Sequence, residues 1–301
     1  MAYDYTTRRL INSIEVNSSM PLAPETFDRV DLLNIADEQM IATLVPTLLR
    51  IKGKYKVHSY DYTMTSETTY AIPPDASGQI LMTVVRVHNN VESDIPMLDV
   101  SETRNNTFAG TGLYGFWIED NNIRLYNSSV VGDVLRIYYY VKPNKLVQIE
   151  EAAQVTEIDG YTVTVAGVPL DWEGGEEINV IHGKPGFETK LKTVLTSIAG
   201  NDFVLEETTG IAVGDWIALI DESPIPQIPH EMHPLLSQAV IVKLLESLGD
   251  LETFKACASV YVAMEKNLIS LMAPRVSLKR QKILTNNNLI NYVRNRGRRY
   301  W

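Results

Sequence analysis

The stretch LSQAVIVKLLESLGD, residues 236–250, decides how this chain must fold. Apolar residues recur at every fourth position from Leu236 to Leu248, which indicates one face of a helix. Gly249 suits the left-handed conformation that ends a helix, and Asp250 suits the cap of a second one. We therefore predict an antiparallel helical hairpin, and its apolar face needs a partner.

The second helix of this hairpin carries an apolar stripe of its own, which Pro274 ends. The stripe comprises Phe254, Cys257, Ala258, Tyr261, Met264, Leu268 and Leu271. The only other helical spacing lies near residues 25–51, where we predict a kink or restart at Pro46. We therefore predict a helical core built by both ends of the chain, residues 1–53 and 227–273.

Between these ends the apolar period changes to two, which indicates strands. Runs rich in Tyr, Thr, Val and Ile fill residues 54–140 and are broken by PPDASG, HNN and EDNN. We predict a first β domain over residues 54–149, either a sandwich or a barrel. The proline-rich segment SPIPQIPHEMHP, residues 223–234, ends the whole β region, since proline cannot donate to a sheet.

The second β domain, residues 150–226, repeats itself. VTEIDGYTVTV (155–165) resembles LTSIAGNDFVL (195–205), and GEEINVI (175–181) resembles GDWIALI (214–220). Two copies predict a small antiparallel barrel formed by duplication, with chance similarity as the alternative. The aligned Gly160 and Gly200 are expected in tight hairpin turns.

The predicted fold class is thus α+β: a small helical bundle, a large inserted antiparallel β region and a C-terminal arm, residues 274–301. The chain has 301 residues, 45% of them apolar and 21% charged, which is typical of a folded protein. The single cysteine, Cys257, cannot form an intrachain disulfide and suits a reducing cytoplasm. We expect no signal peptide and no membrane span.

Net charge is −10, which argues against wrapping duplex DNA, but the charge is unevenly distributed. Residues 275–301 contain eight Lys or Arg and no Asp or Glu, whereas the rest holds 19 basic and 37 acidic residues. The interpretation we favour is an arm that orders on a partner, with aromatic anchors and arginines that pair with acidic grooves. A tail attracted to its own acidic body or to nucleic acid is the alternative. The candidate binding residues are Arg275, Lys279, Arg280, Lys282, Tyr292, Arg294, Arg296, Arg298, Arg299, Tyr300 and Trp301.

No motif predicts catalysis. GTGLYG, residues 110–115, has the glycine spacing of a dinucleotide site, but FWIED follows it as a strand and not as a helix. His230 and His233 are three positions apart, with proline next, and are expected to flank the start of a helix. The remaining histidines, at 58, 88 and 182, and the acidic pairs at 150–151, 176–177 and 206–207 show no catalytic spacing; adjacent strand residues would point to opposite faces. We predict no catalytic, cofactor or metal site.

Three segments resemble the head-to-tail adaptor, or head completion, proteins of tailed bacteriophages. They are DLLNIADEQMIATLVPTLLRIKGKY (31–55), GFWIEDNNIRLYNSSVVGDVLRIYYYVKPNKLV (115–147) and SPIPQIPHEMHPLLSQAVIVKLLESLGD (223–250). The resemblance covers most of the chain and implies a small helical bundle that forms a twelve-subunit ring under the portal. It also implies a C-terminal arm that inserts between portal subunits. The long β insertion departs from the minimal helical family.

The resemblance implies a structural virion protein of the neck or tail, assembled in the host cytoplasm. Its expected partners are the portal protein, tail tube, nozzle or fibre proteins, further copies of itself, and genomic DNA that passes through an acidic channel without sticking. A tail tube or nozzle subunit is the alternative role. A carbohydrate-binding module is a third, and it would use Trp172 or Trp216.

Overall fold

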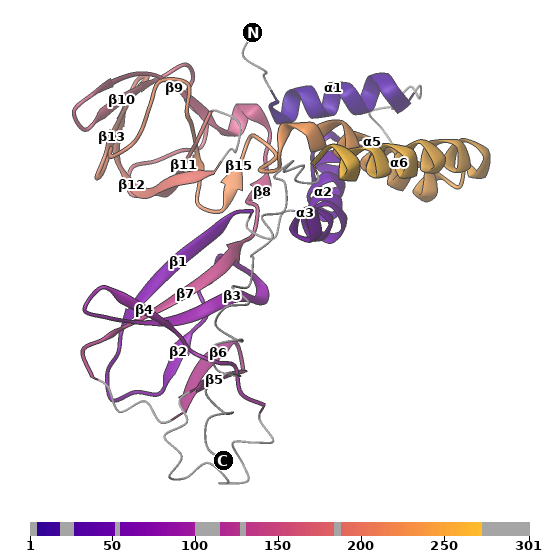
Figure 1. Ribbon diagram of the computed structural model, residues 1–301. Coiled ribbons are helices and arrows are strands. Elements are labelled where there is room, and N and C mark those ends of the chain that lie inside the picture. The colour runs from indigo at the N-terminus through magenta and orange to yellow at the C-terminus, as the bar shows by residue number, and fades with distance from the viewer. Residues whose placement is uncertain are drawn as a thin grey trace, which may run out of the picture.

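The computed structural model describes residues 5–18, 27–51, 55–99, 115–126, 131–183 and 188–272. It combines helices with antiparallel strands, which confirms the predicted α+β class. The helices gather at one end, and the two β regions, one of them a barrel, extend from them in different directions (Figure 1). No described helix has both the length and the apolar character needed to cross a membrane.

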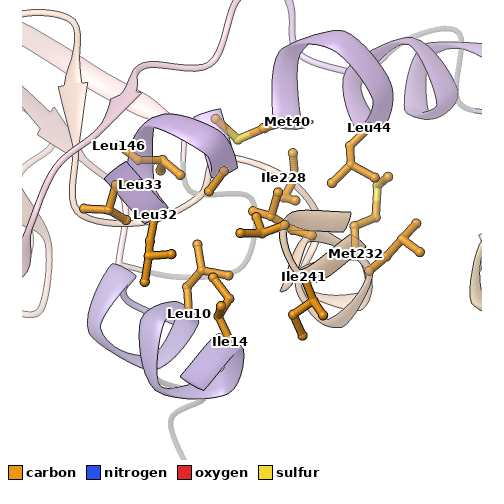
Figure 2. Packing of buried hydrophobic residues seen from close by; sticks show 14 of the residues in the cluster. Leu10, Ile14, Leu32, Leu33, Met40, Leu44, Leu146, Ile228, Met232 and Ile241 are labelled. Atoms are coloured by element: carbon orange, nitrogen blue, oxygen red, sulfur yellow. The ribbon is translucent and has the colours of Figure 1, made fainter. Parts of the chain in front are cut away.

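The helices from the two ends of the chain share one apolar cluster, drawn in Figure 2. They are α1 (Thr7–Ser18), α2 (Arg29–Gln39), the π-helical η1 (Met40–Leu44), α3 (Val45–Ile51), α5 (His233–Leu248) and α6 (Leu251–Met272). Ile14, Met40 and Leu236 are fully buried within the cluster. Burial of each such side chain contributes about 1.5–3 kcal/mol, so this cluster holds the chain ends together.

Helix α1 is a correction, because the sequence pattern placed the only N-terminal helix near residues 25–51. In α1, Leu10, Ile11 and Ile14 point into the shared core, and most of its other residues are polar. Three buried apolar positions in 12 residues give a stripe too short to stand out by periodicity. Tertiary packing against α5 supplies most of the stability that a helix of three turns lacks alone.

The irregularity in the next helical segment covers Met40–Leu44, and a regular α-helix restarts at Val45, one residue before the predicted position at Pro46. The backbone N–H of Val45 donates to the carbonyl of Met40, five residues back. Proline has no N–H, and in a regular α-helix its ring would clash with the carbonyl four residues earlier. A wider π turn immediately before Pro46 relieves that clash, so the chain continues into α3.

The predicted turn between the two helices of the C-terminal hairpin is confirmed. Gly249 has φ of +74°, and the side chain of Asp250 accepts a hydrogen bond from the N–H of Thr253 at 3.2 Å. Two stripe residues were wrong, because Leu248 is 43% exposed and Leu271 is 68% exposed. Positions four apart drift by about 40° per step around a helix, so Leu248 has left the face that Leu236 occupies.

The first β region contains two antiparallel sheets. Its strands are β1 (Val57–Thr63), β2 (Thr69–Ala71), β3 (Ala76–His88), β4 (Val91–Asp94), β5 (Gly115–Glu119), β6 (Asn122–Tyr126) and β7 (Val134–Val141). The sheets have the orders β1-β7-β3-β4 and β2-β6-β5, and residues of both share one core, as in a sandwich. The predicted breaks HNN and EDNN are two-residue turns in which both central residues have positive φ, as a type I′ hairpin requires.

The second β region is a closed barrel. Its strands are β9 (Ala153–Asp159), β10 (Thr162–Val165), β11 (Glu177–Ile181), β12 (Thr189–Ala199), β13 (Asp202–Leu205) and β14 (Trp216–Leu219). They follow the order β10-β13-β12-β11-β14-β9 around the barrel. Closure removes exposed sheet edges, and Phe203 and Leu195 fill the interior.

The barrel order repeats the internal symmetry of the sequence. Exchanging β9, β10 and β11 for β12, β13 and β14 leaves every strand pairing in place. The hairpins β9–β10 and β12–β13 turn at Gly160 and Gly200, whose φ values are +60° and +63°. The expected glycine turns are therefore confirmed, and the two copies form one barrel together.

Two short strands join the parts at the centre of the molecule. β8 (Lys145–Leu146), before the barrel, pairs in parallel with β15 (Glu222–Ser223), after it (Figure 1). Beside them the side chain of Gln227, 1% exposed, accepts from the N–H of Asn144 at 2.9 Å and donates to Thr189 Oγ1 at 3.2 Å. This buried polar junction links the β7–β8 connection, the barrel and the segment that leads into α5.

Candidate functional site

The predicted binding residues of the arm all lie outside the described residues. They are Arg275, Lys279, Arg280, Lys282, Tyr292, Arg294, Arg296, Arg298, Arg299, Tyr300 and Trp301. The candidate site is therefore built from the body of the chain, where three features stand out. These are a buried cluster of charged side chains around Asp215, two exposed apolar flanks on helix α6, and a cleft between α2 and the barrel.

The motifs that suggested chemistry adopt structural roles where they are described. Of GTGLYG, only Gly115 is described, and it begins strand β5, as the following FWIED predicted. His230 starts the short 3-10 helix η3 (His230–Met232), and His233 is the first residue of α5, as expected. Within the described ranges, no group of three or more His, Cys, Asp or Glu side chains is placed to hold a metal ion.

The acidic pairs lie mainly in turns. Glu150 and Glu151 belong to the 3-10 helix η2 (Ile149–Glu151), a single helical turn before the barrel. Glu151 accepts a hydrogen bond from the N–H of Gln148 at 3.0 Å, and Glu150 pairs with Arg8 at 2.7 Å. Both carboxylates thus have partners that fix the segment between β8 and the barrel.

Two histidines of the β regions face aspartates. His88 Nδ1 lies 2.7 Å from Asp133, which also pairs with Arg86. His182 Nδ1 lies 3.3 Å from Asp215 Oδ1. Each contact joins two segments that are distant in the sequence.

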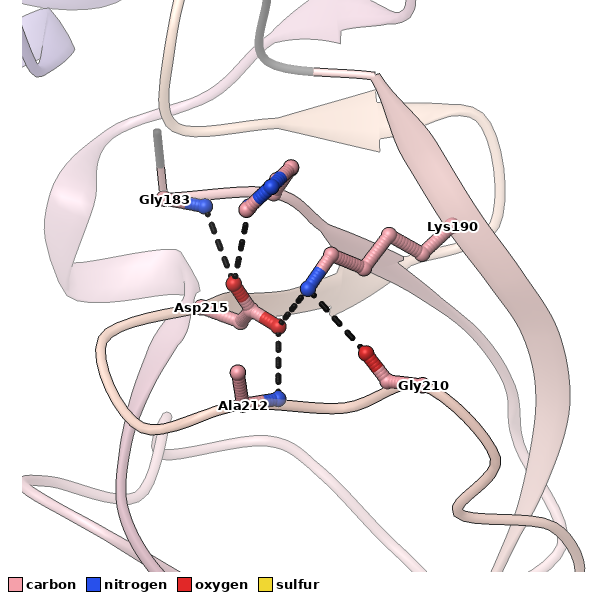
Figure 3. Close-up of polar contacts among 6 residues, drawn as sticks. Gly183, Lys190, Gly210, Ala212 and Asp215 are labelled. Carbon is pink, nitrogen blue, oxygen red and sulfur yellow. Dashed lines mark hydrogen bonds and ion pairs between the residues drawn. The ribbon is translucent and has the colours of Figure 1, made fainter. Parts of the chain in front are cut away.

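Asp215 is the centre of the more buried of these two clusters (Figure 3). Its side chain is 2% exposed and accepts from Lys190 Nζ at 2.6 Å, from the N–H of Ala212 at 2.8 Å and from the N–H of Gly183 at 3.1 Å. Lys190 also donates to the carbonyl of Gly210 at 3.1 Å. The cluster fixes the chain after β11 and the loop before β14 to strand β12.

Electrostatics favour the charged form of this carboxylate. Burial raises the pKa of Asp215, but the hydrogen bonds from Lys190, Gly183 and Ala212 outweigh it and hold the pKa below its usual value. Both carboxylate oxygens of Asp215 accept hydrogen bonds from donors of the same barrel, so this carboxylate stabilises the fold. Sequence reasoning missed this cluster, because its members come from three separate segments.

Helix α6 is the second feature, because four of its large apolar side chains are exposed. Leu251 is 67% exposed and Val262 60%, on one side of the buried stripe. On the opposite side, Val260 is 49% exposed and Leu271 68%. At 3.6 residues per turn these two flanks lie roughly half a turn apart.

The exposed strip of α6 between these two flanks is mainly polar. It contains Glu252, Lys255, Ser259 and Lys266, all exposed. A helix packed on one side only normally shows an apolar stripe and a broad polar face. An extra apolar flank on each side marks surfaces that association can bury.

The third feature is a cleft of about 460 Å³ between α2, the segment 145–151 and the barrel. Its apolar lining includes Val30, Leu33, Leu170 and Trp172, and its acidic lining includes Glu151 and Glu222. Burial raises the pKa of Glu222, as does the nearby charge of Glu151, while Lys145 partly offsets both.

The two tryptophans considered for glycan binding are mostly occupied in packing. The ring of Trp172 stacks at 5.7 Å, centroid to centroid, on Phe203 in the barrel core. Trp216 is 9% exposed and belongs to the same buried cluster as Ile225. Trp216 therefore offers no open face to a sugar, which argues against a carbohydrate-binding role for it, whereas Trp172 is half-buried and also lines the cleft.

No protein-family model matches this chain, and no curated protein matches it at a significant level.

Proposed function

We propose that this chain is a structural subunit of a tailed-phage virion, which forms a ring beneath the portal and joins the head to the tail. The observation that carries the proposal is the pair of exposed apolar flanks on α6. It is supported by the sequence resemblance to head-to-tail adaptors and by the separation of an acidic body from a basic arm. In this proposal the chain has no catalytic role and binds no cofactor.

Two different flanks suit a ring better than a dimer. A two-fold dimer uses one patch twice, whereas a ring joins one patch to a different patch of the next copy. On α6 the flank of Leu251 and Val262 would pack on the flank of Val260 and Leu271 of a neighbour. The buried stripe between them stays attached to the helical bundle that both chain ends build.

The charge distribution supports the remaining contacts. The basic arm would hold the ring on the portal, with arginines that pair with acidic grooves, and the acidic body would let DNA pass without binding. The polar strip of α6 carries Lys255 and Lys266, so it is not the surface that we propose to face the DNA. The two β regions would project toward tail tube, nozzle or fibre proteins.

The test combines the cognate portal rings with the full-length chain and images them by negative stain. We expect an extra layer of density with the natural chain. We expect no layer when Arg294, Arg296, Arg298 and Arg299 are all changed to alanine. If the natural chain gives no layer at micromolar protein and moderate salt, the portal assignment is wrong, and a tail tube or nozzle role replaces it.

The ring interface is tested by chemical cross-linking of the chains on the portal. Val260→Asp alone and Val262→Asp alone should each stop neighbour cross-links, because every contact then has one damaged flank. An equal mixture of the two variants should give dimers but no larger species, because each pair restores one intact contact. Ser259→Asp, on the polar strip, is the matched control and should leave the natural ladder of cross-linked species. A two-fold interface would instead let one of the two variants dimerise alone.

A further inference from the structure

The cleft between α2 and the barrel has the chemistry of a peptide-binding groove. Leu170 is 99% exposed and Val30 is 44% exposed at this cleft, and both are large apolar side chains that water contacts freely. Trp172 adds an aromatic surface to the same lining. An apolar or aromatic side chain placed there would bury surface that the described body leaves open.

The same lining is acidic. Glu150, Glu151, Asp171 and Glu222 contribute four carboxylates, against the single amine of Lys145. Arg8 lies outside the lining and pairs with Glu150 at 2.7 Å, so one of the four carboxylates already has a guanidinium partner. A second guanidinium near Glu151 and Glu222 would neutralise two neighbouring like charges, which favours binding.

Residues 275–301 of this chain match that chemistry. They contain eight Lys or Arg, no Asp or Glu, and Tyr292, Tyr300 and Trp301. Helix α6 ends at Met272, which packs in the same core cluster as Leu146, and Leu146 also lines the cleft. An extended chain spans up to about 3.3–3.6 Å per residue, so the segment after Met272 reaches the cleft easily.

We propose that the cleft between α2 and the barrel binds the basic segment 275–301 of the same molecule before assembly. Two acidic surfaces, the cleft of the same molecule and the partner, then compete for this segment. Binding of the segment in its own cleft lowers the fraction of chains whose arm is free. A partner must therefore bind the arm more tightly, or offer several binding sites, to displace it from the cleft. This regulation rests on the proposed role of the arm in portal binding, whereas docking in the cleft does not.

The experiment uses the full-length chain with Leu170 replaced by the photo-reactive residue p-benzoylphenylalanine. After illumination at low salt, mass spectrometry locates the cross-linked peptides. We expect cross-links to residues 275–301. The double change Glu151→Gln with Glu222→Gln should lower their yield about tenfold, as loss of charge-assisted hydrogen bonds predicts. Raising the salt to about 1 M, where the screening length is about 3 Å, should also lower it.

The control places the photo-reactive residue at Val213, which is 67% exposed on the barrel and does not line the cleft. Equal arm cross-linking from both positions, or none from Leu170, would overturn the proposal. Mixed light and heavy isotope-labelled chains should give cross-links within one chain only, and links between chains would overturn docking in the same molecule.

A last experiment adds portal rings and distinguishes docking in the cleft from portal binding. Loss of the cleft cross-links on binding the portal supports both the docking and the regulation. Cross-links that persist while the portal binds nothing leave the docking in place and contradict the portal role. Portal binding through the arm with no cleft cross-links contradicts the docking alone.

Discussion

At the scale of single residues, Gly160 and Gly200 set the two hairpins of the barrel. Both have positive φ, and a Cβ added at either would meet no atom within 4 Å, so a substitution costs backbone strain alone. We predict that Gly160→Ala and Gly200→Ala each lower the free energy of unfolding by about 1–2 kcal/mol. Urea denaturation measures this. Gly167→Ala is the matched control, because that residue is equally open but lacks positive φ, and it should be neutral or slightly stabilising.

His233 gives the protein a pH dependence at the residue scale. Burial lowers its pKa to about 4, with His230 and Arg9 acting in the same direction and the contact with the Ile228 carbonyl opposing them. Between pH 6.5 and 4 the unfolded chain binds a proton at this residue and the folded chain does not. The free energy of unfolding therefore falls as pH falls, by about 3 kcal/mol across that window from this residue.

The comparison for His233 is His233→Gln, which keeps a hydrogen-bond donor near the Ile228 carbonyl but does not titrate. The difference in unfolding free energy between the natural chain and this variant, followed by denaturation from pH 7 to 4, should change with pH. Parallel pH profiles for the two proteins would show that the pKa of His233 is the same in the folded and the unfolded chain, which contradicts the prediction.

At the scale of elements, α6 shows where helical periodicity is informative and where it is not. The pattern gave the helix and its turn, but it assigned Leu271 to the buried face. We predict that Leu268→Ala, at a site 7% exposed, lowers the free energy of unfolding by about 2–4 kcal/mol. Leu271→Ala, at a site 68% exposed, should change it by less than about 0.5 kcal/mol in the unassembled chain. Equal losses would mean that the helix is rotated.

Other elements were predictable to different degrees for physical reasons. Strands with a period of two and asparagine turns appear clearly in the sequence, because their side chains alternate between core and solvent. Helix α1 did not, because its three buried apolar residues give too little periodic signal. The π turn before Pro46 depends on how the helix relieves a clash, and a proline in a pattern does not specify the position of that relief.

At the scale of the whole molecule, the sites could be predicted far less than the fold. Asp215, Lys190 and Gly183 meet because strands β12, β11 and β14 pair side by side, and the spacing of the three residues along the chain does not indicate that contact. The cleft likewise combines α2 with a barrel loop that lies more than 100 residues later. The sequence did indicate the repeat, and the barrel shows why: both copies are needed to complete one closed sheet.

The buried junction at Gln227 determines whether the parts unfold together. Its Oε1 accepts from the N–H of Asn144, a residue only 6% exposed, and its Nε2 donates to Thr189 of the barrel. Gln227→Leu keeps the bulk but leaves that N–H without an acceptor, so we predict a loss of about 2 kcal/mol in unfolding free energy. The barrel should then unfold in a transition separate from the helices, because the contact of Gln227 with Thr189 is lost. Thr189→Val removes only the longer contacts, at 3.2 and 3.4 Å, and should cost less. Calorimetry distinguishes the outcomes, and a single unshifted transition for Gln227→Leu would show that apolar packing alone couples the barrel to the helical core.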